Sequence, residues 1–403
     1  MTYDVEAIRS HFPALIQGAA HFDGPGGTQV PDVVADAVRS TMVSAIANRG
    51  SVTAAERTAD DVVVQARLAL ADLLGADPRG IVFGRGMTQL TFDFSRTLAK
   101  SWARGDEVVV TRLDHDANIR PWLIAARAAG ATIRWAQFDP DNAELHPDEI
   151  ARLLSTRTKV VAVTGASNLV GTKPDLSKIS DLAHSVGALV YIDGVHLTAH
   201  APVDVAAFGA DFYACSPYKF FGPHCGAIAG RPDVLETLSP DKILPSSDEI
   251  PERFELGTLP YELMAGTTAA INFLADLSPG PAMNRRDRLA VSMTAIEEHE
   301  DRLRARIEAG IGELDGVVVR SRAERRTPTL LLTFHDRDPS DAYRFLGEFG
   351  VNAPAGAFYA VEASRWLGLG DQGGLRVGLA PYSSDADVDR LLDGLKSFTG
   401  SGI

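Results

Sequence analysis

The sequence predicts an α/β protein with a mostly parallel sheet covered by helices, followed by a smaller α+β region. Between residues 81 and 230, short β-branched runs alternate with segments whose apolar residues recur at three- and four-residue spacing. This alternation is typical of parallel strands joined by crossover helices. A stretch rich in Pro, Ser and acidic residues at 238–260 interrupts the pattern, and long helices follow it. Such a change indicates a domain boundary.

Seven strands are expected in the first region, so the predicted sheet is seven-stranded. They are 81–84, 107–110, 132–135, 159–163, 188–192, 211–214 and 226–229, and two intervening helices are 123–129 and 176–185. The second region is expected to hold helices at 262–277, 285–314, 340–348 and from 385, with strands at 317–320, 327–334 and 375–379. We therefore divide the chain into a large domain at 21–260 and a small α+β domain at 261–403, on which residues 1–20 are expected to pack.

The composition limits the partners and the compartment. The chain has 403 residues, 45% of them hydrophobic and 23% charged, and its 39 basic and 53 acidic residues give a formal charge of −14. This acidic balance argues against binding to nucleic acid or to an anionic membrane. Cys215 and Cys225 are too few for a disulfide framework and too isolated for a thiolate metal site. Because the N-terminus lacks the features of a signal peptide and no apolar segment is long enough to span a bilayer, we expect a cytoplasmic protein.

Lys219 and Asp193 together predict a pyridoxal phosphate site. Lys219 lies in a small polar turn with Ser216 and Tyr218, and Asp193 ends a predicted buried strand. A lysine that aromatic neighbours partly desolvate loses its proton easily, as a Schiff base with a carbonyl cofactor requires. A carboxylate at a strand end can keep a pyridine nitrogen protonated, and the Ser216 hydroxyl can hold a phosphate oxygen. Taken singly, Asp193 as a helix cap and Lys219 as an exposed loop residue are the alternatives.

A glycine turn after the first predicted strand offers a second phosphate contact. Gly84 and Gly86 precede Met87 and Thr88 at the start of a helix, where backbone N–H groups and the helix dipole favour an anion. The turn half-matches a dinucleotide fingerprint, but Gln89 stands where the third glycine belongs. A plain helix start capped by Thr88 is the alternative.

Single polar residues add to this set. His115 could stack on a planar ring, Asn168 could donate to a carboxylate or phenolate oxygen, and His196 could reach a ring oxygen. Arg376 interrupts an apolar strand, where its guanidinium could bind an amino-acid carboxylate or pair with an acidic side chain. Thr258 offers a hydroxyl in a glycine-containing turn. Solvated histidines, a turn asparagine and an ordinary loop threonine are the plainer interpretations.

In their order along the chain, these residues resemble the fold-type-I pyridoxal phosphate enzymes of the class V aminotransferase family, specifically its cysteine desulfurase-like branch. The resemblance covers nearly the whole chain, from 22–28 through 48–50 to the last helix. It implies a homodimer with pyridoxal 5'-phosphate on Lys219, Asp193 at the pyridine nitrogen and His115 stacked on the ring. The other implied contacts are Asn168, His196 and Tyr218 beside the cofactor, Gly86, Met87, Thr88 and Ser216 around the phosphate, Thr258 at the phosphate of the other subunit, and Arg376, Asn168, Arg49 and Tyr359 on the substrate side.

The sequence departs from the family pattern at several of these positions. Met87 replaces a more usual threonine, Tyr218 a histidine and His196 a glutamine, so Met87 can give only its backbone N–H. Desulfurases of the family carry a cysteine on a small-domain loop that accepts sulfur as a persulfide. The corresponding stretch here is 355–360, and no cysteine follows Cys225.

The resemblance therefore implies a pyridoxal phosphate-dependent enzyme that acts on an amino acid, with Lys219 moving the Cα proton. C–S bond cleavage of desulfurase or lyase type, without the persulfide cysteine, is the first expectation and rests on the resemblance alone. Transamination, racemisation or another Cα or Cβ reaction is the alternative, with Tyr359 either an acid or base in place of the thiol or a packing residue. Cys225 is a further candidate nucleophile. A nicotinamide dehydrogenase and an inactive cofactor-binding relative are the alternatives from other classes.

Overall fold

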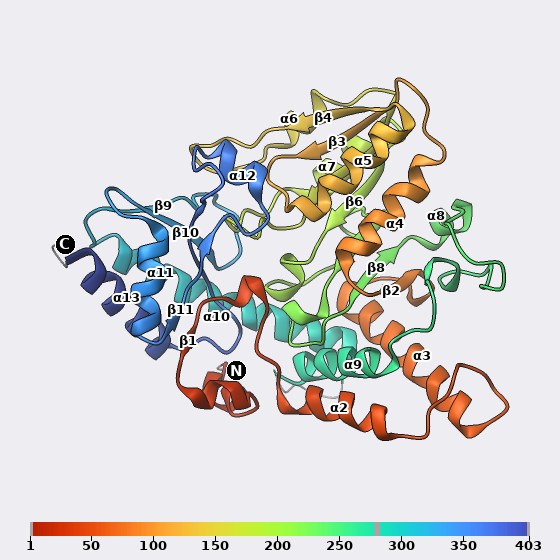
Figure 1. Cartoon of the computed structure of the whole chain (residues 1–403), viewed down its shortest axis with the longest axis horizontal. Helices are drawn as coiled ribbons and strands as arrows, with labels where there is room; N and C mark the ends of the chain where they lie inside the picture. The colour runs from red at the N-terminus through yellow and green to blue at the C-terminus, as the bar shows by residue number, and fades with distance from the viewer. Residues whose placement is uncertain (1–2, 278–282, 401–403) are drawn as a thin grey trace.

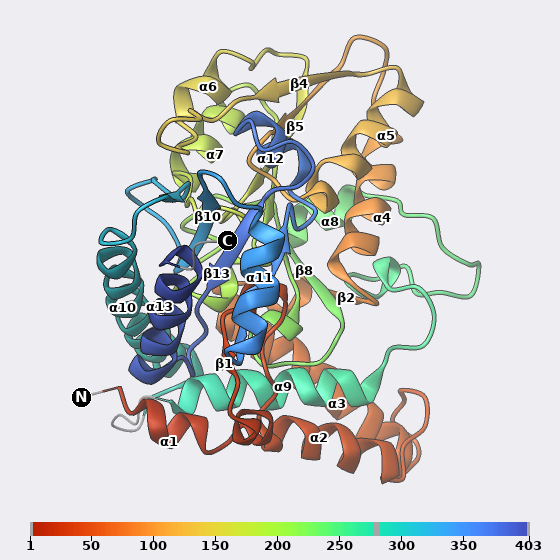
Figure 2. The same ribbon diagram turned by 60° about the vertical axis from the view of Figure 1, so that its left-hand side comes forward.

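The computed structural model describes residues 3–277 and 283–400. Residues 1–2, 278–282 and 401–403, which the predicted domain ranges include, lie outside the described residues. Figures 1 and 2 show a large sheet with helices on both faces and, beside it, a smaller sheet with its own helices. In the described part of the chain, no helix combines the length and the apolar character needed to cross a bilayer.

The large sheet has seven strands in the order β2-β8-β7-β6-β5-β3-β4. They are β2 (Ile81–Gly84), β3 (Glu107–Thr111), β4 (Thr132–Ala136), β5 (Thr158–Thr164), β6 (Leu189–Asp193), β7 (Phe212–Cys215) and β8 (Gly226–Gly230). Every pair from β4 to β7 is parallel, whereas β8 runs antiparallel to both β7 and β2. The predicted strands and the mostly parallel sheet are confirmed, and the carboxyl ends of β3, β5, β6 and β7 meet at one edge.

Two hydrophobic cores sandwich this sheet, because successive strand residues point to opposite faces. In β3, Val109 packs in the core shared with α3 (Ala54–Leu74), α7 (Leu176–Ser185) and α9 (Tyr261–Asp276). Its neighbours Val108 and Val110 pack in the core shared with α4 (Met87–Ala99) and α5 (Arg120–Ala129). The helix α2 (Asp32–Val43) packs against α9 at the outside of the first core (Figure 2).

The small sheet is antiparallel, in the order β12-β13-β10-β9. Its strands are β9 (Val317–Val319), β10 (Thr329–Phe334), β12 (Ala355–Gly356) and β13 (Gly374–Gly378). The helices α10 (Arg285–Ile311), α11 (Pro339–Glu348) and α13 (Asp385–Gly400) share a third core with it. The predicted strands and helices of this region are found, with α10 ending three residues earlier than the predicted helix at 285–314. The short strands β1 (Ala20–His21), β11 (Val351–Asn352) and β12 were not predicted, because two residues carry no periodicity.

The N-terminal segment lies against the C-terminal region. The Tyr3 hydroxyl donates to the Pro381 carbonyl oxygen at 2.7 Å. Arg9, at the end of α1 (Val5–Arg9), forms an ion pair with Asp387 at 2.7 Å. The remaining helices are α6 (Pro147–Ala151), α8 (Pro232–Thr237) and α12 (Val361–Trp366). The domain division at residue 260 stays a prediction.

Candidate active site

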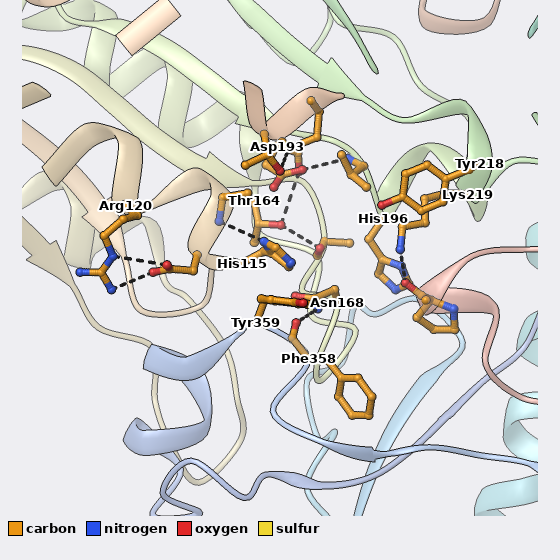
Figure 3. Close-up of a pocket in the computed structure, with 18 of the residues that line it drawn as sticks. His115, Arg120, Thr164, Asn168, Asp193, His196, Tyr218, Lys219, Phe358 and Tyr359 are labelled. Atoms are coloured by element: carbon orange, nitrogen blue, oxygen red, sulfur yellow. Dashed lines mark hydrogen bonds and ion pairs between the residues drawn. The ribbon is translucent and has the colours of Figure 1, made fainter. Parts of the chain in front are cut away.

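A cavity of about 590 Å³ opens at the carboxyl edge of the large sheet, where the small sheet meets it (Figure 3). Its walls come from segments far apart in the sequence, because each loop after a parallel strand reaches this edge. The predicted residues that line it are Met87, Thr88, His115, Asn168, Asp193, His196, Tyr218, Lys219, Tyr359 and Arg376. The structure therefore brings together most of the predicted site in one place.

Lys219 is a half-buried residue in the turn after β7. Its Nζ donates to the carbonyl oxygen of Pro25 and lies 4.8 Å from the ring centroid of Tyr218. Burial and, to a smaller extent, the positive charge of Arg376 lower the pKa of Lys219 to about 7, against the opposing effect of Asp193. At neutral pH a large fraction of this amine is therefore uncharged and nucleophilic.

Asp193 lies at the end of β6, with 4% of its surface exposed. One carboxylate oxygen accepts the backbone N–H of Val195 at 3.0 Å. Burial raises the pKa of Asp193 to about 6, against the opposing effect of this hydrogen bond and of the Lys219 charge. A cationic partner placed here would be stabilised, because it would neutralise a buried carboxylate.

His115 is held in one orientation by its own turn. Its Nδ1 accepts the backbone N–H of Ala117 at 3.0 Å, so Nε2 carries the proton of the neutral ring. Burial lowers the pKa of His115 to about 4, and the Lys219 charge adds to the effect. Asp114, which is fully buried, accepts the Asn118 amide at 2.7 Å and fixes the same turn.

Arg376 and Phe358 bring the small sheet into the site. The guanidinium carbon of Arg376 lies 3.7 Å from the ring centroid of Phe358, and its Nη1 donates to the carbonyl oxygen of Asn168 at 3.1 Å. The side-chain amide of Asn168 donates to the carbonyl oxygen of Phe358 at 2.9 Å. Among the described residues, the Nε of Arg376 and the Oδ1 of Asn168 are buried polar atoms without a partner. Because both residues line the cavity, these two atoms are available to hydrogen-bond a group bound in it.

The N-terminus of α4 forms another part of the wall. Gly86 is its N-cap residue and supplies no side-chain hydrogen bond, while Met87 and Thr88 line the cavity. Gly226 of β8 lies so close that a Cβ there would come within 2.2 Å of the Met87 nitrogen. Ser216 is buried near Lys219, and its hydroxyl has no partner within the described part of the chain. The N-terminus and this hydroxyl are both free to bind an anion.

Four predicted residues do not line the cavity. Gly86 and Ser216 flank lining residues in the sequence, and Thr258 is exposed in the bend before α9. Arg49 forms ion pairs with Asp60 and Glu252, both at 2.8 Å. The predicted roles, of Thr258 at the phosphate of the other subunit and of Arg49 on the substrate side, stay predictions.

Several lining residues were not predicted. They are Pro25, Gly26, Phe92, Asp116, Ala117, Arg120, Thr164, Ala166, Val195 and Phe358. For Pro25 and Gly26, the glycine-rich stretch 24–27 was a sequence signal that could have predicted a place in the cavity wall, because a chain segment that passes close to a ligand favours glycine. Phe358 carried no signal, since its position depends on left-handed backbone at Phe358 and Tyr359, with φ of 51° and 59°.

This sheet, with a lysine and a carboxylate at its edge and a small sheet closing the cavity, is the fold of the fold-type-I pyridoxal phosphate enzymes. The crystal structure of the cysteine desulfurase CsdA from Escherichia coli matches it with a TM-score of 0.86 at 27% identity, over 98% of this chain and 98% of that chain.

The chain belongs to the aminotransferase class-V family, whose profile matches residues 20–391. It is 34% identical to the uncharacterized protein MT3887 of Mycobacterium tuberculosis, over 98% of this chain and 100% of the relative. It is 30% identical to the cysteine desulfurase CsdA of Escherichia coli strain K12, over 96% of this chain and 95% of the relative. The predicted family and fold are confirmed. The protein is thus an enzyme of the cysteine desulfurase-like kind, in a family that typically uses pyridoxal phosphate.

Proposed function

We propose that this enzyme binds pyridoxal 5'-phosphate through Lys219 and cleaves the C–S bond of a sulfur-containing amino acid without a persulfide cysteine. The observation that carries the proposal is the half-buried Lys219 amine, with its pKa lowered to about 7, in the same cavity as the buried carboxylate of Asp193. A cytoplasmic location stays a prediction.

The residues of the cavity fit this cofactor. The uncapped N-terminus of α4 and the unpartnered Ser216 hydroxyl suit its phosphate, and Asp193 suits its pyridinium nitrogen. His115, neutral and held by its turn, would be the ring that stacks on the cofactor. When bound, the cofactor supplies an electron sink for the electrons left at Cα when a proton is removed.

The protein residues would then divide the work. The Arg376 guanidinium, buried and stacked on Phe358, would bind the substrate carboxylate and orient the amino acid. The Lys219 amine, once displaced by the substrate amine, would accept the Cα proton as a general base. Phe358 and Tyr359 would limit the access of water from the side of the small sheet.

The cysteine residues support a reaction without a thiol nucleophile. Cys215 and Cys225 are both buried, and burial raises the pKa of each thiol, that of Cys225 to about 11. A thiol that stays protonated is a weak nucleophile. We therefore favour direct elimination, in which the substrate loses its sulfur as sulfide and the remaining enamine is hydrolysed to pyruvate and ammonia. Transamination or another Cα or Cβ reaction is the alternative product outcome.

The test is a product assay across sulfur-containing amino acids, with sulfide, pyruvate, alanine and keto acids measured together. We expect sulfide and pyruvate in equal amounts, retained in the double variant Cys215→Ala/Cys225→Ala. Lys219→Ala should lose both the product and the visible Schiff-base band, and the loop variant Lys242→Ala serves as its control. Loss of sulfide release in the cysteine double variant would reinstate a thiol nucleophile. Formation of a keto acid without sulfide would identify an aminotransferase. A visible cofactor band without any product would identify an inactive relative.

A further inference from the structure

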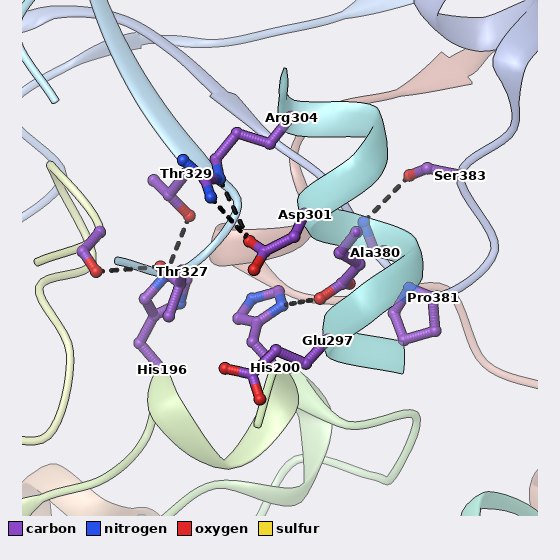
Figure 4. Close-up of polar contacts among 12 residues, drawn as sticks. His196, His200, Glu297, Asp301, Arg304, Thr327, Thr329, Ala380, Pro381 and Ser383 are labelled. Atoms are coloured by element: carbon purple, nitrogen blue, oxygen red, sulfur yellow. Dashed lines mark hydrogen bonds and ion pairs between the residues drawn. The ribbon is translucent and has the colours of Figure 1, made fainter. Parts of the chain in front are cut away.

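A buried cluster of two histidines and a glutamate lies behind the cavity wall, between the turn after β6 and the helix α10. Figure 4 labels the two histidines, His196 and His200, beside this helix. His196, which lines the cavity, packs against His200 with the ring planes at 68° and the centroids 4.7 Å apart. The Nδ1 of His200 lies 2.9 Å from a carboxylate oxygen of Glu300 on α10. The exposed fractions are 3% for each histidine and 0% for Glu300.

The hydrogen bonds of His196 show which of its two ring nitrogens the protein already occupies. Its Nε2 lies 3.0 Å from the hydroxyl oxygens of both Thr327 and Thr329. The Thr327 hydroxyl itself donates to the carbonyl oxygen of Gly171 at 3.3 Å, so Nε2 is held by two threonine hydroxyl groups that are fixed in the small sheet and the loop before it. Among the described residues, Nδ1 is buried and has no partner. The ring nitrogen left for a group in the cavity is therefore Nδ1.

Glu300 fixes the ring that packs on His196. Burial raises the pKa of Glu300, and His200 opposes this effect. A lone buried carboxylate is costly, so the hydrogen bond between His200 Nδ1 and Glu300 is what offsets the burial of that carboxylate. With Nδ1 committed to Glu300, the imidazole of His200 cannot rotate without breaking a buried bond.

We propose that His200 and Glu300 are positioning residues, which hold the ring of His196 so that its unpartnered Nδ1 meets a group bound in the cavity. The identity of that group as pyridoxal phosphate rests on the proposed function. Where the family more often has a glutamine amide, this site would use the imidazole of His196. The orientation of that ring would depend on Glu300 of α10.

The test uses the cofactor-free protein. Variants Glu300→Ala, Glu300→Gln and His200→Ala are compared in the wild-type and His196→Gln backgrounds. The matched control is Glu297→Ala, one turn earlier on α10, where Glu297 pairs with Lys173 at 2.6 Å. Two quantities are measured: the His196 ring tautomer by ¹⁵N NMR, and the dissociation constant for pyridoxal phosphate. Thermal unfolding of each variant checks that it is folded.

We expect Glu300→Ala and His200→Ala to mix the His196 tautomers and to weaken pyridoxal phosphate binding about tenfold. Glu300→Gln retains an acceptor for His200 and should stay within about threefold, and Glu297→Ala should be unchanged. In the His196→Gln background, Glu300→Ala should change the dissociation constant less than about twofold, because there is no imidazole to position.

Three outcomes would overturn the inference: an unchanged His196 tautomer in Glu300→Ala, equal losses in Glu300→Ala and Glu300→Gln, or an undiminished loss in the His196→Gln background. If the wild-type protein bound no pyridoxal phosphate but the tautomers mixed as described, the proposed function would fail and the positioning role would stand.

Discussion

The protonation of Lys219 sets the pH at which the cofactor can be loaded. Only the uncharged amine attacks an aldehyde, and the pKa of Lys219 is lowered to about 7. The rate of Schiff-base formation should therefore rise about tenfold from about pH 6 to about pH 8 and then level off. Stopped-flow absorbance after mixing cofactor-free protein with pyridoxal phosphate measures this rate. A rate that keeps rising in proportion to hydroxide above pH 8 would show an ordinary, solvated lysine.

Asp193 should lower the stability of the cofactor-free protein at neutral pH. Its pKa is raised to about 6 in the folded protein, so between about pH 4 and pH 6 the folded state binds more protons than the unfolded state. Stability is lost as the pH rises through this window, and the full cost is present above it. Asp193→Asn keeps an acceptor for Val195 and removes the charge.

The Asp193→Asn variant should therefore be more stable than the wild type by about 1–3 kcal/mol near pH 7.5, with the difference disappearing near pH 4. Urea unfolding at the two pH values measures this. Equal stability at the higher pH would mean that Asp193 is well solvated.

Site residues that follow a strand could be predicted, whereas those that depend on distant packing could not. Asp193 and Lys219 each come directly after a buried run, so the sequence indicates the sheet edge at which they lie. Glu300 is one of several charged residues on α10, and only tertiary packing places it against His200. Arg376 could be placed in its strand, but its stacking on Phe358 depends on an irregular loop.

The loop between β12 and α12 carries backbone strain. Phe358 and Tyr359 are consecutive non-glycine residues in the left-handed region, a conformation that costs about 1–2 kcal/mol per residue. The backbone is held there by hydrogen bonds from loops of the large sheet: the Tyr359 carbonyl oxygen accepts the Asp116 N–H at 2.8 Å, and the Phe358 carbonyl oxygen accepts the Asn168 amide at 2.9 Å. Because the Tyr359 side chain is 76% exposed, it contributes little burial in return.

Tyr359→Gly should therefore raise the free energy of unfolding by about 1 kcal/mol, since glycine adopts this φ without strain. Thermal or urea unfolding is the measurement. Phe358→Gly is the contrast, because it also removes the ring under Arg376 and should destabilise the protein. A loss of stability in Tyr359→Gly would show that the Tyr359 ring packs more tightly than its exposure indicates.

The strands of the large sheet and their mostly parallel arrangement could be predicted along the chain, but the antiparallel direction of β8 was not. The seven runs with β-branched or apolar residues all became strands of the large sheet. β8 runs antiparallel because the connection from β7 is too short for a crossover helix, which parallel strands require. The end of α10 was placed less accurately, since apolar residues continue to Leu314 beyond the last helical turn.

At the level of the whole molecule, we predict a homodimer. Met42 and Val43 at the end of α2 are 67% and 72% exposed, and Leu244 is 97% exposed, which is unusual for large apolar side chains. Light scattering should give twice the chain mass, and Met42→Asp/Val43→Asp should raise the monomer fraction. Because Thr258 is predicted to reach the phosphate of the other subunit, the monomer should bind pyridoxal phosphate more weakly. A fully active monomer would contradict both predictions.

The pairing of β2 with β8 has a consequence for how the protein is made. This pairing aligns Gly84, just before α4, with Gly226, just after the loop that holds Lys219. The same strand contact therefore positions both the N-terminus of α4 and the Lys219 loop. About 140 residues separate the paired strands, and forming such a long-range contact is slow. On the ribosome, the nascent chain must emerge beyond β8 before the cavity can exist, so the cofactor is expected to be captured after most of the chain has been translated.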